Sequence, residues 1–255
     1  EFVVNVGESE DNTLELVKSI ANSKIRIIES KWNDKMLDRG YVYGQQKMIA
    51  QFNCTGDWAF YIEGDEVYHE NELELIRESM TMYLDDPNVE ALAFNFYHFY
   101  GNANSYLDSP GWYRSEVRII KNSVRSYAPD GLFWLVLDSN KKGRYPKAKV
   151  VGAYCYHYGW VRSEEQMNLK SRKVQKYWGK DPTNTDYSKI DQSIIKEFQG
   201  THPKIIKSWL PKEFGLYKAD INYQINKKQK KHRLMIKLEK LFGIELSKKH
   251  YKLVK

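Results

Sequence analysis

The chain contains 255 residues, of which 42% are hydrophobic, so it can bury the core of one large domain or of a domain with an extension. No apolar run approaches the roughly 20 residues that cross a bilayer, which argues against a membrane-spanning protein. The net charge of +7 is concentrated in the last third and favours an anionic partner, such as a phosphorylated substrate, anionic lipid or nucleic acid. Cys54 and Cys155 lack any paired spacing, and reduced cysteines of this kind indicate a cytoplasmic protein.

The first hundred residues alternate strand and helix signals at the spacing of an α/β fold. Strands are predicted over 2–6, 25–28, 58–62 and 89–99. Apolar residues recur at helical spacing between these strands, over 14–20, 48–52 and 70–84. Asp11 or Asn12 can cap the first helix, because either side chain accepts the free N–H groups of a first turn.

The second part of the chain begins with a predicted loop over 98–113, which is rich in Gly, Asn, Ser and Pro. Further strands are predicted over 116–121, 132–137 and 149–157. Helices are predicted over 163–178, 187–199 and 231–242. We therefore expect an α/β domain over residues 1–180 and a helical, basic C-terminal extension over residues 181–255.

An acidic cluster follows the third predicted strand. Glu63, Asp65 and Glu66 surround Gly64 there, and a glycine allows the backbone to turn closely around a ligand. In open α/β sheets ligands bind off the carboxyl ends of the strands, and crowded carboxylates are costly unless a cation lies among them. Such hard oxygen ligands suit Mn²⁺ or Mg²⁺ that also contacts a substrate phosphate. The alternative is a solvated acidic turn.

Several segments in order resemble glycosyltransferase family 2. VNVGESEDNT, the region around Gly44-Gln45-Gln46 and TGDWAFYIEGDEV resemble its nucleotide-sugar-binding half. WYRSEVRIIKN resembles the acceptor-side segment of bacterial members, and AYCYHYGWVRSEEQMNLKSRK resembles their H-Y-G strand end and lysine-bearing helix. The resemblance covers residues 1–180, apparently without the family's first strand.

This resemblance implies the GT-A fold, a Rossmann-like mixed, mainly parallel sheet flanked by helices. It also implies a metal-dependent, inverting glycosyltransferase. Such an enzyme moves a sugar from a nucleotide-diphosphate donor to a glycan or lipid-linked acceptor, by default in surface polysaccharide synthesis. The first strand of the family and an initiating Met are both missing, so the chain looks cut at its front.

The resemblance also assigns the cation site. Asp65 matches the family's metal-coordinating acid, Glu63 occupies the place of the first acid in its motif, and His157 matches its late histidine. A neutral imidazole is a reasonable ligand for Mn²⁺, although a histidine at a strand end is more often simply hydrogen-bonded. The residues expected to contact the nucleotide-sugar are Glu8, Ser9, Asp11, Gln46, Glu63, Gly64 and Asp65. Turn and cap chemistry is the alternative for Asp11.

Displacement at the anomeric carbon needs one carboxylate base for the acceptor hydroxyl. Glu116 and Asp130 are the candidates in the acceptor-side half, with Asp108 behind them. The basic side chains that can contact phosphate oxygens are Arg114, Arg118 and either Lys170 or Arg172. A solvated basic face is the alternative, and it is favoured for Lys170 and Arg172.

Two rival functions stay open. A nucleotidyltransferase acting on sugar phosphates also uses a metal at an acidic strand end. A non-enzymatic basic module would bind anionic membrane or nucleic acid, although no nucleic-acid motif is recognised and that partner is not expected. The last predicted helix carries leucines among lysines, which fits a cytoplasmic protein that contacts the inner face of an anionic membrane. Packing of this helix on the catalytic domain fits the same pattern equally well.

Overall fold

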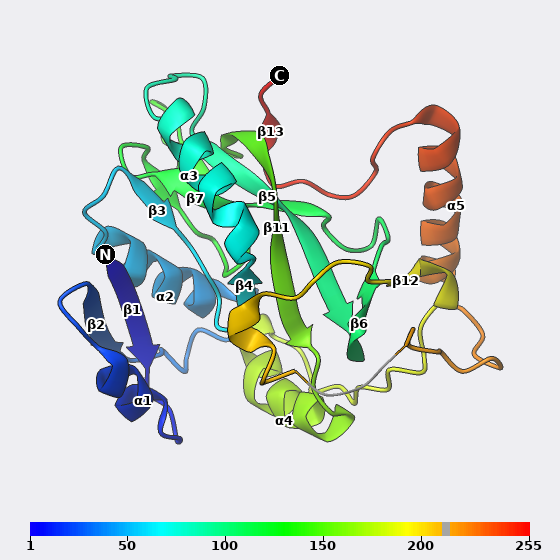
Figure 1. Ribbon diagram of the computed structural model, residues 1–255. Coiled ribbons are helices and arrows are strands. Elements are labelled where there is room, and N and C mark those ends of the chain that lie inside the picture. Colours follow the sequence, from blue (N-terminus) through cyan, green and yellow to red (C-terminus); the bar gives the residue numbers. More distant parts are fainter. Residues whose placement is uncertain (211–214) are drawn as a thin grey trace.

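The computed structural model describes residues 1–210 and 215–255 (Figure 1). Its helices are α1 (Thr13–Ile20), α2 (Tyr41–Phe52), α3 (Leu73–Met82), α4 (Glu164–Val174) and α5 (Lys227–Phe242). Short 3₁₀ helices are η1 (Glu70–Glu72), η2 (Gln175–Trp178), η3 (Gln192–Ile194) and η4 (Lys204–Ile206). In Figure 1, β1 and β2 lie on one side of the large sheet and α5 lies on the other.

The strands form three sheets. The large sheet contains β3 (Trp58–Phe60), β4 (Glu66–Tyr68), β5 (Ala91–Tyr100), β6 (Asn102–Leu107), β7 (Ser115–Lys121), β11 (Lys147–Trp160), β12 (Ile195–Glu197) and β13 (Lys252–Leu253). The small sheets contain β1 (Phe2–Gly7) with β2 (Ile25–Ser30), and β8 (Ser126–Tyr127) with β9 (Leu135–Leu137) and β10 (Gly143–Arg144). Parallel β5 and β11 form the centre of the large sheet, and β4 lies along the outer edge of β11.

The expected mainly parallel, Rossmann-like sheet is wrong. Of the ten strand pairings in the described residues, seven are antiparallel, and only β1–β2, β5–β11 and β11–β13 are parallel. One cause is the segment 98–113, predicted as a loop, which contains β6. Only Gly101 separates β5 from β6, and a connection this short joins antiparallel strands alone. The backbone φ of Gly101 is +72°, a conformation that glycine adopts without strain.

The expected helix over 187–199 is also wrong. This segment forms η3 and then β12, which pairs antiparallel with β6. Its apolar residues Ile190, Ile194 and Ile195 are buried in one cluster, and their spacing fits a helix and an irregular buried segment equally well. The strands β12 and β13 bring residues beyond 180 into the large sheet, while the division of the chain at residue 180 stays a prediction.

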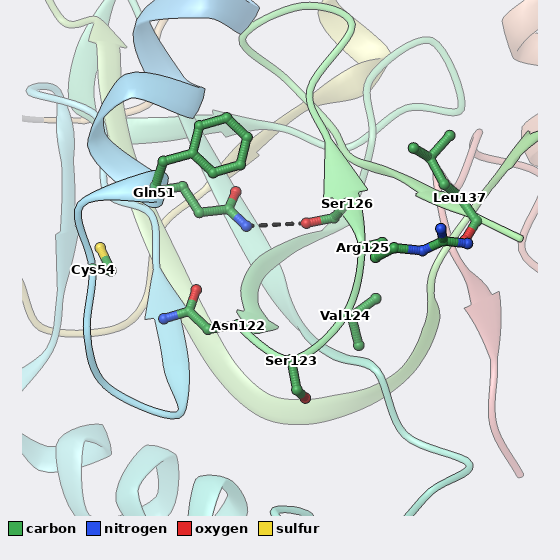
Figure 2. Close-up of a pocket in the computed structure, with 9 residues that line it drawn as sticks. Gln51, Cys54, Asn122, Ser123, Val124, Arg125, Ser126 and Leu137 are labelled. Atoms are coloured by element: carbon green, nitrogen blue, oxygen red, sulfur yellow. Dashed lines mark hydrogen bonds between the residues drawn. The ribbon is translucent and has the colours of Figure 1, made fainter. Parts of the chain in front are cut away.

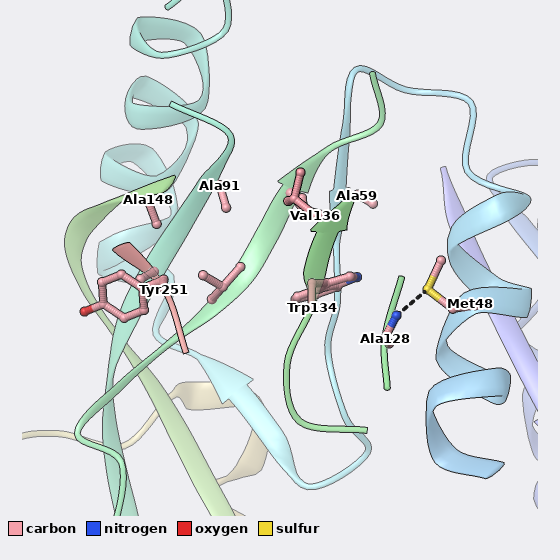
Figure 3. Packing of buried hydrophobic residues seen from close by; sticks show 11 residues of the cluster. Met48, Ala59, Ala91, Ala128, Trp134, Val136, Ala148 and Tyr251 are labelled. Atoms are coloured by element: carbon pink, nitrogen blue, oxygen red, sulfur yellow. Dashed lines mark hydrogen bonds between the residues drawn. The ribbon is translucent and has the colours of Figure 1, made fainter. Parts of the chain in front are cut away.

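A hydrophobic cluster fastens α2 to the large sheet (Figure 3). Trp134 is fully buried in this cluster, which also contains several small side chains such as Ala59 and Ala91. The Trp134 Nε1–H donates to Gln51 Oε1 of α2 at 2.6 Å, so the buried indole has its polar partner. Met48 of the same helix accepts from the backbone N–H of Ala128 through its sulfur at 3.2 Å.

We searched residues 1–210 and 215–255 for a helix long and apolar enough to pass through a bilayer, and none meets both conditions.

Candidate functional site

The predicted ligands Asp65 and His157 lie together near the carboxyl ends of β5 and β11. His157 Nε2 is 3.8 Å from Asp65 Oδ1, and their side chains are 14% and 15% exposed. The backbone holds Asp65 in place, because Tyr158 N–H donates to the Asp65 carbonyl at 2.8 Å. The next residue, Glu66, begins β4, which pairs with β11 opposite His157. The fold therefore brings together two residues that are 92 positions apart.

Gly159 leaves a space between these two side chains. A Cβ added at Gly159 would lie 2.7 Å from His157 Nε2 and 2.8 Å from Asp65 Oδ2. Both atoms therefore point towards the same small volume, which any other residue at position 159 would fill. Gly64 is different, because a Cβ there would meet nothing within 4 Å. No close approach therefore requires a glycine at position 64.

Two further groups contact the pair. Lys170 of α4 places its Nζ 3.3 Å from Asp65 Oδ2. The start of α4 is held by a capping box, in which the side chains of Ser163 and Gln166 each accept from the other's backbone N–H. On the other side, His98 Nδ1 is 3.2 Å from His157 Nδ1. Burial alone would raise the pKa of Asp65, but His157 and Lys170 outweigh it and hold that pKa below its ordinary value.

The other two acids of the cluster, Glu66 and Glu63, lie beside a buried arginine. Arg118 of β7 donates to Glu66 Oε1 through Nη2 at 2.6 Å and to Oε2 through Nε at 3.0 Å, and both side chains are 1% exposed. Glu63 Oε1 lies 3.7 Å from the same Nη2. The desolvation of Glu63, reinforced by Glu66 and Asp65 and opposed by Arg118, raises its pKa to about 7. Arg118 is thus committed to these carboxylates and does not reach a phosphate.

The donor set fits a divalent ion only in part. Among the residues that the structure describes, no group of three His, Cys, Asp or Glu side chains is arranged to hold a metal. Asp65 and His157 supply two convergent donor atoms, with the space at Gly159 beside them. Mn²⁺ or Mg²⁺ bound to a diphosphate needs only one or two protein ligands, because phosphate oxygens and water complete the shell. Glu63, by contrast, lies towards Arg118.

Gln46 of α2 connects the helix to both strands of the β1–β2 sheet. Its Oε1 accepts from Asn5 Nδ2 at 2.9 Å and from Ser30 Oγ at 2.5 Å, and its Nε2 donates to the Lys31 carbonyl at 3.2 Å. Asn5 Oδ1 is buried and has no hydrogen-bond partner within the described part of the chain. Sequence reasoning missed Asn5, although a polar residue inside the apolar run 2–6 was a usable signal.

The other expected nucleotide contacts lie at the carboxyl end of β1 and are exposed. Glu8 pairs with Lys31 at 3.2 Å, and Ser9 Oγ donates to the Asp11 carbonyl at 3.3 Å. Asp11 Oδ1 accepts the Thr13 N–H at 3.0 Å, which is the turn and cap chemistry of the alternative interpretation. The Thr13 hydroxyl, which also donates to Asp11 Oδ1, and the Thr13 N–H lower the pKa of the Asp11 carboxyl.

Sequence reasoning also missed an aromatic cluster beside this edge. Trp32 meets Tyr43 and Tyr177 with ring centroids 5.0 and 5.1 Å apart, and Tyr43 stacks on Trp178 at 5.7 Å. A Cβ at Gly7 would lie 2.2 Å from Trp32 Nε1, so glycine permits the close approach of the indole to β1.

The three predicted bases each have other hydrogen-bond partners in the structure. Glu116 has a fully buried side chain, and its Oε2 lies 2.5 Å from His250 Nδ1. Asp130 Oδ1 accepts the Leu132 N–H at 2.8 Å, which is turn chemistry. Asp108 accepts from Arg114 Nε at 2.6 Å. In residues 1–210 and 215–255, none of the three acids hydrogen-bonds to Asp65 or His157.

A separate pocket of about 450 Å³ lies at the carboxyl end of α2 (Figure 2). Its lining includes Cys54, Asn122 and Arg125, and Gln51 Nε2 lies 3.0 Å from Ser126 Oγ across it. None of the residues predicted to bind nucleotide, metal or acceptor belongs to this lining.

The convergent features are therefore Asp65, His157, Lys170 and the space at Gly159, at the carboxyl ends of the two central parallel strands. This is the position at which parallel strands generally present ligand-binding groups. Compared with known proteins, the chain matches no protein-family model and no curated protein.

Proposed function

We propose that this chain is a metal-dependent, inverting glycosyltransferase that uses a nucleotide-diphosphate sugar. The observation that carries the proposal is the convergence of Asp65 Oδ2 and His157 Nε2 on the space left by Gly159. The ordered resemblance to glycosyltransferase family 2 supports the same reaction, because it implies a metal on Asp65 and His157, and these two side chains lie together in the fold.

Each residue at the site has a role in this proposal. Asp65 and His157 hold a divalent ion, and that ion, when bound, supplies Lewis-acid neutralisation of the leaving diphosphate. The Lys170 ammonium adds a second positive charge beside the same phosphate oxygens, and its side chain is exposed enough to reach them. Asp130 is the better of the two predicted bases, because the fully buried Glu116 cannot meet an acceptor unless the core opens.

The test is nucleoside-diphosphate release from a panel of nucleotide sugars, with and without Mn²⁺. We expect one donor to be consumed only with Mn²⁺. The variant Asp65→Asn should reduce the turnover by about three orders of magnitude or more, because the charge stabilisation that a catalytic ion supplies is lost. Asp138→Asn is the matched control, because Asp138 is also an ion-paired aspartate but pairs with Arg144 outside the site. Full turnover in Asp65→Asn would remove the metal assignment.

The same samples distinguish the two rival reactions. A nucleotidyltransferase would release pyrophosphate from a nucleoside triphosphate and a sugar phosphate, whereas the proposed enzyme releases a nucleoside diphosphate. Asp130→Asn and Glu116→Gln should differ by orders of magnitude in kcat, with the larger loss in Asp130→Asn. Equal, modest losses would exclude both residues as the base.

We further propose that the acceptor is reached at an anionic membrane surface through α5. One face of this helix packs on the protein: Arg233 binds Asp191 at 2.6 Å, Glu239 binds Arg114 at 2.7 Å, and Ile236 joins a hydrophobic cluster. Arg233, Ile236 and Glu239 follow a spacing of three, so the opposite face of α5 points away from the body.

That opposite face combines apolar and basic residues. Leu234, Leu238, Leu241 and Phe242 lie on it, and Leu241 and Phe242 are 74% and 64% exposed. The flanking lysines on the same helix are Lys227, Lys230, Lys231 and Lys237. An exposed apolar stripe between lysines is complementary to an anionic bilayer, where the leucines enter the interface and the lysines meet the lipid phosphates.

Vesicle sedimentation tests this contact. We expect binding to vesicles with anionic lipid, weak binding to neutral vesicles, and loss of binding at high salt. The triple variant Leu234→Ser, Leu241→Ser, Phe242→Ser should lose the binding, and Ile205→Ser, which changes an exposed isoleucine of η4, should retain it. If the triple variant sediments like the wild type, the membrane face is not on α5.

A further inference from the structure

Another pocket, of about 450 Å³, lies at the end of the large sheet opposite to Asp65 and His157. It is formed where β5 and β11 begin, whereas Asp65 and His157 lie near the ends of these two parallel strands. In Figure 1, β13 marks the end with this pocket and α4 marks the other end. Lys147, at the start of β11, precedes His157 by a length of strand of roughly 30 Å. The pocket is therefore separate from the site proposed above.

Four lysines line this pocket, which we call the lysine pocket: Lys147, Lys149, Lys252 and Lys255. Lys147 and Lys149 flank the fully buried Ala148 of β11, so the alternation of a strand places both lysines on the same face of the sheet. Lys252 is the register partner of Lys147 in the parallel pairing of β11 with β13. Because neighbouring strands are only about 4.8 Å apart, the stems of these two lysines start side by side.

The positive charges of the lysine pocket are not balanced by the protein. In residues 1–210 and 215–255, none of the four lysines has a carboxylate within ion-pair distance. Asp86 is the one acid among the described lining residues, and its Oδ1 accepts the Asn88 N–H at 2.8 Å. Like charges at paired strand positions repel each other, so Lys147 and Lys252 are stabilised when an anion lies between them.

The interactions of Lys149 hold a third ammonium group at the same pocket. Lys149 Nζ donates to the Lys255 carbonyl at 2.9 Å and lies 5.7 Å from the centre of the Tyr83 ring, at the end of α3. Lys149 follows Lys147 by two positions, which is about 7 Å along a strand. The lysine pocket therefore presents a facing pair of ammonium groups and a third group farther along β11.

The charge and the shape of the lysine pocket indicate a phosphate ligand with more than one phosphate group. Four lysines and one aspartate give the lining a formal charge of about +3 at neutral pH. Lysine binds phosphate as a point charge, whereas planar carboxylates are matched best by arginine, which is absent from the described lining. A diphosphate carries several negative charges on two linked groups. One group can lie between Lys147 and Lys252 while the other meets Lys149.

We propose that the lysine pocket is a binding site for the diphosphate group of a small anionic ligand. The protein supplies the positive charge, so this site requires no metal ion. The bound diphosphate bridges β11 and β13, which pair through only two residues each, and it therefore stabilises this join. The inference goes beyond the proposed function and does not depend on it, because no residue of the lysine pocket takes part in the proposed reaction.

The experiment is isothermal titration calorimetry with inorganic pyrophosphate, in buffer with EDTA so that no divalent ion is present at Asp65. We expect the wild type to bind one pyrophosphate. Each partly exposed ammonium group contributes a factor of about two to five, so removing three should weaken binding about tenfold or more. The triple variant that removes them is Lys147→Gln, Lys149→Gln, Lys252→Gln.

The matched control loses the same net charge elsewhere. It replaces three exposed lysines that do not line the pocket, and its affinity for pyrophosphate should stay within about twofold of the wild type. Its changes are Lys24→Gln, Lys35→Gln, Lys196→Gln. Circular dichroism verifies the fold of both variants. If the pocket variant does not fold, the single variant Lys252→Gln, at an exposed position, should still weaken binding about twofold to fivefold.

Three further ligands identify what the lysine pocket recognises. Adenosine diphosphate that binds like pyrophosphate, and is lost in the pocket variant, supports a site for the diphosphate group of a nucleotide as well as for the free anion. Sulfate should bind about tenfold more weakly or worse, because it offers a single group of lower charge. Equal affinities for sulfate and pyrophosphate, or unchanged pyrophosphate binding in the folded pocket variants, overturn the inference. A single-stranded oligonucleotide that displaces pyrophosphate at lower concentration than adenosine diphosphate assigns the lysines to nucleic acid and also overturns it.

Discussion

Asp65 and Glu66 are adjacent acids with opposite surroundings. Glu66 is sealed in the core and bound by two nitrogens of Arg118, so its charge is fully compensated by the protein. Asp65 faces His157, Lys170 and the space at Gly159, and solvent reaches all three side chains. Adjacent acids at a strand end can therefore differ in role, because Glu66 is part of the buried core and Asp65 stays accessible to solvent.

The largest expected effect comes from breaking the buried pair. Arg118→Met would leave Glu66 as an uncompensated charge in the core, at a cost of about 3–5 kcal/mol in the free energy of unfolding. Asp65→Asn should cost less than about 1 kcal/mol, because solvent reaches both of its partners, Lys170 and His157. Urea unfolding of both variants checks the difference. Equal losses would contradict the division of roles.

The second prediction concerns the space beside Asp65. Gly159→Ala places a methyl group against both donor atoms and should weaken Mn²⁺ binding about tenfold or more, within the range seen when the surroundings of metal ligands are disturbed. Gly64→Ala is the control, because its methyl group meets nothing and should leave Mn²⁺ affinity unchanged. Isothermal titration calorimetry with Mn²⁺ measures the affinity of both variants. A similar affinity in both would mean that the space has no role.

A third acid, Asp191, represents an intermediate case, because its carboxylate is buried while its partner Arg233 is half exposed. Burial raises the pKa of Asp191, but the bonds from Arg233 and Ser193 outweigh it and lower that pKa. A lowered folded-state pKa stabilises the fold above the unfolded-state value of about 3.9 and loses that contribution as the pH falls through the folded-state value.

Asp191→Asn should therefore cost about 1 kcal/mol at pH 7, a value reduced for the exposure of Arg233, and the cost should shrink as the pH falls below about 4. Urea unfolding of wild type and variant at pH 7 and pH 3 measures it. A cost that stays the same at both pH values would show that Arg233 does not stabilise the ionised carboxylate.

The smallest expected effect is that of Lys170→Met, which should change the affinities for Mn²⁺ and for a nucleoside diphosphate in opposite directions. Lys170→Met removes a positive charge 3.3 Å from Asp65 and should tighten Mn²⁺ binding about twofold to fivefold, while weakening binding of a nucleoside diphosphate by a similar factor. Lys173→Met, on the same helix but paired with the exposed Glu10, should change neither affinity. If Lys170→Met weakens both ligands, Lys170 supports the shape of the site rather than its charge balance.

The sequence allowed the acidic cluster and His157 to be proposed, because an apolar strand followed by acids and an H-Y-G strand end are local patterns. It could not show which acid is structural, since that depends on Arg118, which lies 52 positions from Glu66 and meets it only through the sheet. The contact between His98 and His157 could not be predicted for the same reason, because it depends on the strand register that places the two residues opposite each other.

The prediction of a mainly parallel sheet was wrong for a related reason. A buried apolar run has the same pattern in a parallel and in an antiparallel sheet, so β3 and β7 gave no signal of direction. The strand β6 reads NANSYL, which resembles a loop, and it is a strand because β5 and β12 pair with its two edges. Local preference was overruled there by tertiary pairing.

The most direct test of the central claim is a Mn²⁺ titration of the wild type and of Asp65→Asn, followed by the electron paramagnetic resonance signal of the free ion. The claim predicts one bound ion in the wild type and an affinity at least about tenfold weaker in Asp65→Asn, because one of two protein ligands loses its charge. Equal Mn²⁺ binding by the two proteins, or none by the wild type, would contradict it.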